Sequence, residues 1–259
     1  MLTRFLCLAA ACLLVASCAR TATEDHLEKV EALTSQVKTL EADMAMRSDT
    51  DAGEASRHFT FSGHFAMQVV EDAGGPARCL LNSRMKTTEG YGAGDEFLAV
   101  CDGDVQWTEN RTTEGNTTKV YKTSPDTGAR VVMGWMLQFA KEYDLTFAGQ
   151  GELDGERLWV FQGTLRPAGK NDGPWRSRLP NTMTVSVSPQ DGVPRRQVTQ
   201  LTRGNMEITC ETRLTNVKVN GKLDPALFKY TPPEGVEVTD LMKEPDAGEE
   251  QGAKDDAGK

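Results

Sequence analysis

Few residues of this 259-residue chain have the types and spacing that enzyme chemistry requires. His58 and His64 stand six residues apart on the polar side of one alternating segment, and no third metal ligand stands near them. Asp102 and Asp104 flank a glycine, which is typical of a turn. The sequence contains no Gly-x-Ser-x-Gly, no His-Glu-x-x-His and no phosphate-binding glycine loop. We therefore expect surface histidines, no enzymatic activity, no metal and no cofactor.

The N-terminal segment predicts export and lipid attachment. Arg4 supplies a positive start, residues 5–16 are apolar, and Leu14-Val-Ala-Ser-Cys18 ends the run. This ending resembles the lipobox of bacterial lipoproteins, in which a cysteine is acylated and becomes the first mature residue. An ordinary signal-peptidase site and an uncleaved anchor are the alternatives. The resemblance implies a signal peptide over residues 1–17 and acyl groups such as palmitate on Cys18, which would anchor the protein stably. Ala19 is not the aspartate of inner-membrane retention and so favours the outer membrane, facing the periplasm.

The composition excludes several classes of protein. Hydrophobic residues make up 38% and charged residues 26%, which is ordinary for a globular domain. The net charge of -9 argues against a nucleic-acid partner. No apolar run reaches the roughly 18 residues of a membrane-spanning helix. We expect one sizeable domain with dispensable ends.

The segment before this domain has a helical pattern. From Thr23 to about Arg47 the spacing of apolar residues alternates between three and four, at Val30, Leu33, Val37, Leu40 and Met44. With the lipidated cysteine, this gives a helical segment over residues 18–47. Two interpretations stay open: a short coiled coil that binds a partner or self-associates, and a single amphipathic helix lying on the main domain. The small polar residues 48–56 predict a linker, and the acidic residues 243–259 predict a disordered tail.

Residues 57–242 predict one mainly β domain. Residues 58–69 alternate apolar and polar, as expected for a strand with one buried face. Nine further segments share the pattern, separated by turn signals such as Asp154-Gly155: 78–87, 96–102, 105–109, 119–123, 143–149, 157–165, 182–188, 195–202 and 206–219. The one strong helix within the domain follows Ser124-Pro125, which supplies a cap and a first-turn proline. This α+β pattern predicts a curved antiparallel sheet or half-barrel.

Large apolar side chains face the predicted interior of this sheet. They can fill an ordinary core, or they can line a cavity suited to acyl chains of varying shape. Patterning alone favours the filled core, but acyl binding requires no polar chemistry and so fits the sequence as well. The candidates for a lipid cavity are Phe61, Phe65, Met67, Met85, Phe97, Trp107, Met133, Met136 and Phe139.

Four segments carry a family resemblance. Residues 97–107 run as a strand, Asp-Gly and Trp, and residues 143–160 form the next predicted strand pair. Residues 185–195 contain a strand, Asp-Gly and Pro-Arg, and residues 220–236 contain Asp-Pro-Ala-Leu-Phe followed by Pro-Pro-Glu-Gly-Val. In this order they resemble the LolA/LolB/LppX superfamily of lipoprotein carriers and lipid-binding lipoproteins, over about residues 57–241.

The resemblance implies a half-open antiparallel barrel of about ten to eleven strands, preceded by an N-terminal helix. One or more helices would pack in an apolar concavity that receives acyl chains. Leu227 and Phe228 would plug one end of the barrel. If residues 78–87 and 96–102 form a hairpin on this scheme, Cys79 could face Cys101, either as a disulfide or as two small buried side chains. Cys210 would then be a buried free thiol.

The expected function is that of a membrane-anchored lipoprotein that binds an acyl chain or the lipid moiety of another lipoprotein, as a carrier or an acceptor. A chain tethered at Cys18 cannot cross the periplasm, so the tethered members of the superfamily are the closer relatives. The alternative is an envelope interaction or stress-sensing module that uses the same fold with a filled core.

Overall fold

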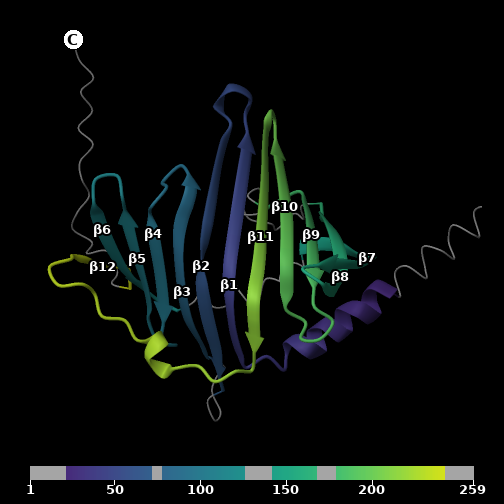
Figure 1. Cartoon of the computed structure of the whole chain (residues 1–259), viewed down its shortest axis with the longest axis horizontal. Coiled ribbons are helices and arrows are strands. Elements are labelled where there is room, and N and C mark those ends of the chain that lie inside the picture. Colours follow the sequence, from purple (N-terminus) through teal and green to yellow (C-terminus); the bar gives the residue numbers. More distant parts are fainter. Residues whose placement is uncertain (1–21, 72–77, 126–141, 168–178, 243–259) are drawn as a thin grey trace, which may run out of the picture.

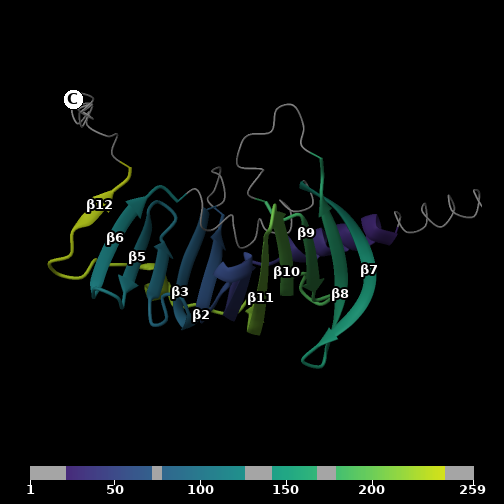
Figure 2. The same ribbon diagram turned by 90° about the horizontal axis from the view of Figure 1, so that it is seen from above.

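The computed structural model describes residues 22–71, 78–125, 142–167 and 179–242, whose strands form one curved twelve-stranded sheet (Figures 1 and 2). The strand order is β12-β6-β5-β4-β3-β2-β1-β11-β10-β9-β8-β7, and β12 and β7 are its two unjoined ends. Neighbouring strands are antiparallel except for β12, which runs parallel to β6. This arrangement confirms the expected mainly β, half-open fold, with twelve strands rather than ten or eleven. No helix in the described ranges is long and apolar enough to cross a membrane.

The ten strands predicted within the β domain are all present, with small shifts at their ends. The strands are β1 (Thr39–Asp51), β2 (Arg57–Val70), β3 (Arg78–Gly90), β4 (Glu96–Cys101), β5 (Gln106–Thr112), β6 (Thr117–Thr123), β7 (Tyr143–Leu153), β8 (Glu156–Leu165), β9 (Thr182–Val187), β10 (Pro194–Arg203), β11 (Met206–Val219) and β12 (Val238–Asp240). Two short 3-10 helices are η1 (Gly53–Ala55) and η3 (Pro225–Phe228). The signal peptide, Cys18, the helix predicted after Ser124-Pro125 and the acidic tail lie outside the described residues.

The segment before the domain is half helix and half strand. A helix covers residues 22–34 and packs on the sheet, while β1 begins at Thr39, so the prediction of a helix as far as residue 47 is wrong. Leu40 and Met44 stand four residues apart, a spacing that shares one face of a helix and equally one face of a strand. Pairing of β1 with both β2 and β11 decides for the strand. The predicted linker, residues 48–56, is the end of β1 and the turn into β2.

The sheet has two unlike faces. The inner face is the one on which the helix over residues 22–34 packs (Figure 2). Two buried apolar clusters lie on it, one over β1 to β4 and one under the helix over β7 to β9. The opposite, outer face carries most of the charged side chains of β1 to β3, and the C-terminal segment crosses it at η3. Alternation along each strand separates the two sets of side chains.

Candidate functional site

The cross-strand register assembles an apolar surface on the inner face of β1 to β4. Leu40 lies opposite Met67, which lies opposite Leu81, and Cys101 completes this row on β4. These four side chains are between 0 and 4% exposed and belong to one cluster. A tightly packed row of this kind is the filled core of the domain.

The next row, which contains Ala42 and Phe65, is equally buried, and the row after it is more open. Met44 lies opposite Gly63, which lies opposite Met85, and Phe97 ends this row on β4. Met85 is 7% exposed, whereas Phe97 is 39% exposed. Gly63 contributes no side chain, because a Cβ atom there would come within 1.9 Å of the carbonyl oxygen of Arg84. The apolar surface therefore runs from a filled core to a partly exposed end and includes two flexible methionines.

The predicted cavity residues divide between these parts. Phe65 and Met67 are in the filled core, Met85 is at its border, and Phe61 and Phe97 are in the open part. Met133, Met136 and Phe139 lie outside the described residues. The interpretation of residues 23–47 as a helix hid the contribution of β1. Its signal was a strict alternation: Leu40, Ala42, Met44 and Met46 share one side, separated by residues that face the other.

Trp107 does not belong to the inner face. It pairs with Val100 on the outer face, and its ring lies 5.5 Å from the ring of Tyr230 in the C-terminal segment. The reason is that the outer face has an apolar patch of its own, which the C-terminal segment covers with Phe228, 3% exposed. Leu227 and Phe228 thus pack on the outer face and do not plug the concavity, contrary to the prediction. Leu227 is itself 37% exposed.

A hydrogen-bonded cluster holds the C-terminal segment in place. The Tyr230 hydroxyl donates to the buried carboxylate of Glu109, which also accepts from Arg111. Burial, together with the bond to Glu109, raises the pKa of Tyr230 above its ordinary range. The Asn82 amide donates to the Leu227 carbonyl oxygen at 2.6 Å. These contacts fix the segment that leads on to β12.

The helix over residues 22–34 closes the other half of the inner face. Val30 packs among Tyr143, Phe161, Met183 and their neighbours on β7 to β9. One turn earlier, the ring of His26 stacks on that of Phe147 with centroids 3.8 Å apart. Aromatic stacking and apolar burial together orient the helix across the strands.

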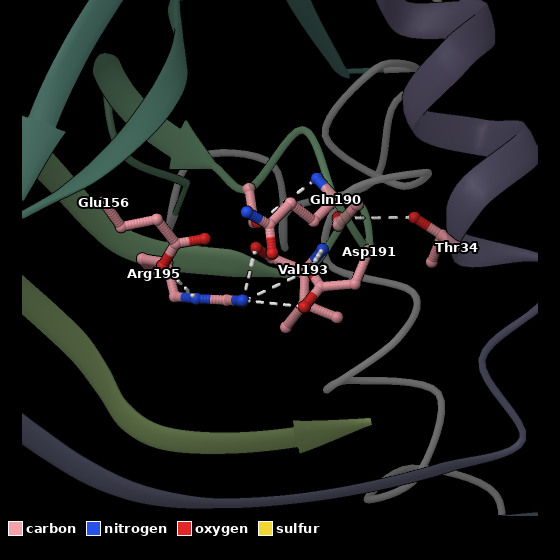
Figure 3. Close-up of polar contacts among 8 residues, drawn as sticks. Thr34, Glu156, Gln190, Asp191, Val193 and Arg195 are labelled. Carbon is pink, nitrogen blue, oxygen red and sulfur yellow. Dashed lines mark hydrogen bonds and ion pairs between the residues drawn. The ribbon is translucent and has the colours of Figure 1, made fainter. Parts of the chain in front are cut away.

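The turn between β9 and β10 secures the end of this helix (Figure 3). The Arg195 guanidinium donates to Asp191 at 2.7 Å and to Glu156 at 2.9 Å. With its side chain 11% exposed, Arg195 is well shielded, so these charged bonds hold the turn rigidly. The Thr34 hydroxyl, on the last helical residue, lies 3.4 Å from the Gly192 carbonyl oxygen. The Asp-Gly and Pro-Arg elements singled out in the sequence thus position the helix.

Cys79 and Cys101 are free thiols in the structure. In the pairing of β3 with β4, Cys101 lies opposite Leu81, two residues from Cys79, so the two cysteines do not face each other as predicted. Cys79 lies opposite Val69 on the other side, in β2. Both thiols pack with the apolar cluster, in agreement with the second interpretation. Burial raises the pKa of Cys79 to about 11, which makes it a poor nucleophile at neutral pH. Cys210 is also free, and half-buried.

The outer face carries the two histidines of the β domain. His64 lies 2.9 Å from the Asp43 carboxylate and 3.4 Å from that of Glu41, while His58 lies 3.7 Å from that of Glu89. Hydrogen bonds from Asn216 and His64 lower the pKa of Asp43. Across the described ranges no three metal-ligating side chains come together. A groove of about 660 Å³ opens beside this network, and its lining combines polar and charged residues such as His64, Arg84 and Lys86 with Met44, Gly63 and Met85.

No protein-family profile and no curated protein sequence matches this chain. Solved structures of other proteins do match. Lipoprotein LppX of Mycobacterium tuberculosis is 14% identical with a TM-score of 0.43, and the match covers 76% of this chain and 94% of that protein. A LolA superfamily protein of Nitrosomonas europaea is 12% identical with a TM-score of 0.29, over 80% of this chain and 97% of that one.

A third match comes from a Pseudomonas aeruginosa complex of MucA and MucB. It is 14% identical with a TM-score of 0.38, covering 80% of this chain and 60% of the matched one, so this chain spans less than two thirds of that length. The superfamily named from the sequence motifs is thus among the structures matched. Likeness at these values is remote, and it assigns neither a ligand nor a partner to this chain.

Proposed function

We propose that this protein binds an acyl chain, or the lipid moiety of a lipoprotein, on the inner face of its sheet, as a non-enzymatic carrier or acceptor. The observation that supports this is the open row Met44, Gly63, Met85 and Phe97. It continues the buried core outward and ends on an aromatic side chain that is 39% exposed. Flexible methionines beside an exposed aromatic side chain suit a chain-like apolar ligand whose shape varies.

We also propose that acylation of Cys18 anchors the protein in the cell envelope, with the domain in the periplasm. Cys18 and the first described residue of the helix, Ala22, are only four positions apart in the sequence. Even a fully extended chain of that length spans only about 14 Å. Because the helix packs on the sheet and is not a free stalk, such an anchor would keep the inner face close to the membrane.

Native mass spectrometry and lipid extraction test the binding proposal. The protein should be the mature chain with Cys18→Ser, exported to the periplasm. A fragment over residues 57–241 would not serve, because it lacks β1, which lies between β2 and β11. We expect one co-purifying lipid per chain, lost in Phe97→Asp but retained in Tyr91→Asp. Tyr91 is a matched control, since it is an aromatic residue 76% exposed in a turn outside the row.

The outer groove favours a second function, contact with another protein. Its walls combine carboxylates and cations with apolar residues, a mixture that is found at protein interfaces. A lipid-free mass with no uptake of a fluorescent fatty acid would contradict lipid binding. Capture of an envelope protein, lost in Arg84→Glu, would then establish the interaction module.

A further inference from the structure

The groove on the outer face continues across the sheet. Two further hollows adjoin it, one of about 100 Å³ over β3 to β5 and one of about 470 Å³ between these strands and the C-terminal segment. Arg84 lines all three, and we call them together the outer cleft. It reaches from Thr215 on β11 to Arg111 on β5. The five steps between these neighbouring strands cover about 24 Å, the length of about seven residues of extended chain.

The four carboxylates that line the outer cleft already have partners. These partners are His64 and Asn216 for Asp43, Lys86 for Glu96, Tyr230 and Arg111 for Glu109, and the backbone N–H of Ala226 for Asp224. A ligand that brings cations would therefore have to compete with bonds that the folded protein already makes.

Two cations of the outer cleft are unpaired. Arg84 and Lys229 both line the hollow beside the C-terminal segment, and no described residue forms an ion pair or a hydrogen bond with either side chain. The register explains this for Arg84, because its cross-strand neighbours are His64 and Leu98, and neither is an anion. The binding capacity that remains free in the outer cleft thus favours a carboxylate, which a guanidinium can hold through two parallel hydrogen bonds.

The hollow shared by these cations also has apolar walls. Leu98 and Val100 line it from β4, and Leu227, which is 37% exposed, lines it from the C-terminal segment. Ser62 and Thr231 add hydroxyls that can bond a peptide backbone. Cations beside apolar side chains, in a cleft several residues long, suit an extended chain with acidic and apolar side chains better than a single small anion.

We infer that the outer cleft binds an extended acidic segment of another protein, with a carboxylate on Arg84 and Lys229 and an apolar side chain against Leu98 and Leu227. This inference rests on the second proposed function, protein contact at the outer groove, and names the chemistry of the partner. It is independent of lipid binding on the inner face.

Fluorescence anisotropy tests the inference on the mature chain with Cys18→Ser. The probes are a fluorescein-labelled seven-residue peptide of aspartate and leucine, and its counterpart with asparagine in place of aspartate. We expect the acidic peptide to bind at least tenfold more tightly. Arg84→Gln should remove most of this preference, and Arg84→Lys should keep part of it, because lysine retains the charge without the planar fork. Arg203→Gln is the matched control and should preserve it, since Arg203 is exposed at the end of β10, outside the outer cleft.

Each other outcome overturns the inference. Equal affinity for the two peptides, or an intact preference in Arg84→Gln, would do so. Binding of phosphatidylglycerol vesicles without binding of the acidic peptide would assign the outer cleft to a membrane surface. If the peptide binds only after the acidic residues of 243–259 are changed to amides, the occupant is the tail of the same chain.

Failure of the inference can be told apart from failure of the second proposed function. Capture of an envelope protein that is lost in Arg84→Glu, without binding of the acidic peptide, would overturn only the chemistry inferred for the partner. If neither the peptide nor an envelope protein binds, both fail, and lipid binding on the inner face is still judged by its own test.

Discussion

At the scale of single residues, Gly63 shows how backbone approach and surface shape are linked. It stands in the middle of β2, where a glycine is unfavourable for strand stability. Its place follows from the close contact with β3, since a Cβ atom would meet the Arg84 carbonyl oxygen at 1.9 Å and the Met85 Cα atom at 2.7 Å. The same close contact brings β2 and β3 together between Met44 and Met85 in the proposed ligand surface.

Substitution Gly63→Ala should therefore destabilise the fold by about 2 kcal/mol, because backbone atoms of β3 would have to move. Urea unfolding followed by circular dichroism measures this change. Gly221→Ala is the matched control, because nothing lies within 4 Å of a Cβ atom at that position. Equal stability of the two variants would show that β2 and β3 can separate without cost.

At the scale of elements, two segments outside the strands complete the domain from opposite faces. The helix over residues 22–34 covers the inner face of β7 to β9, and the C-terminal segment with η3 covers the outer face of β3 and β4. Figure 1 shows both segments lying against the sheet. Each is held by apolar burial together with a few specific polar contacts.

The helix is expected to depend on Val30, which is 4% exposed in the second cluster. Val30→Ala should lower the free energy of unfolding by about 2 kcal/mol, through the lost burial and the cavity that it leaves. The neighbouring Lys29 is exposed, so Lys29→Ala should change it by no more than about 0.5 kcal/mol. Urea unfolding of both variants measures the difference, and similar effects would mean that the helix does not pack as described.

The C-terminal segment is expected to loosen at high pH. Because the pKa of Tyr230 is raised in the folded protein, its phenol stabilises the fold fully below about pH 10, the ordinary tyrosine pKa. This stabilisation is lost as the pH rises towards the higher pKa of the folded state. Tyr230→Phe should thus be less stable than the parent at pH 8, with the difference shrinking by pH 11. Tyr91→Phe, at an exposed position, is the control, and a difference independent of pH would count against the bond to Glu109.

At the scale of the whole molecule, the sheet is long but its ends are protected. β12 has only three residues, and the edge strand β7 carries a bulge between Phe147 and Gly149. Short or bulged edge strands resist pairing with other chains. The molecule can thus expose part of an apolar inner face without offering a regular edge for aggregation.

A ligand on the inner face should stabilise the whole domain, because it would bind the folded protein and not the unfolded chain. At a free concentration one hundred times its dissociation constant, the gain is about 2.7 kcal/mol. Thermal unfolding of the Cys18→Ser chain with monopalmitoylglycerol checks this, and Phe97→Asp should show a much smaller rise in Tm. An equal rise in both proteins would place the ligand elsewhere.

The sequence alone determined the local structure of the β domain. Period-two alternation and Asp-Gly turns located ten strands, because both depend on residues that are close in the chain. The order of the motifs led to the half-open sheet. The alternation also assigned Phe65, Met67 and Met85 to the inner face.

Only the tertiary structure decided what depends on partners distant in sequence. Spacings of four fit a helix and a strand alike, so β1 became a strand through pairing with β2 and β11. Trp107 lies on the outer face, where Tyr230 of the C-terminal segment, more than one hundred residues later in the chain, packs against its ring. The register of β3 against β4 left Cys79 and Cys101 unpaired. Alternation divides a strand into two faces, but which face is covered, and by what, depends on contacts that the local pattern does not contain.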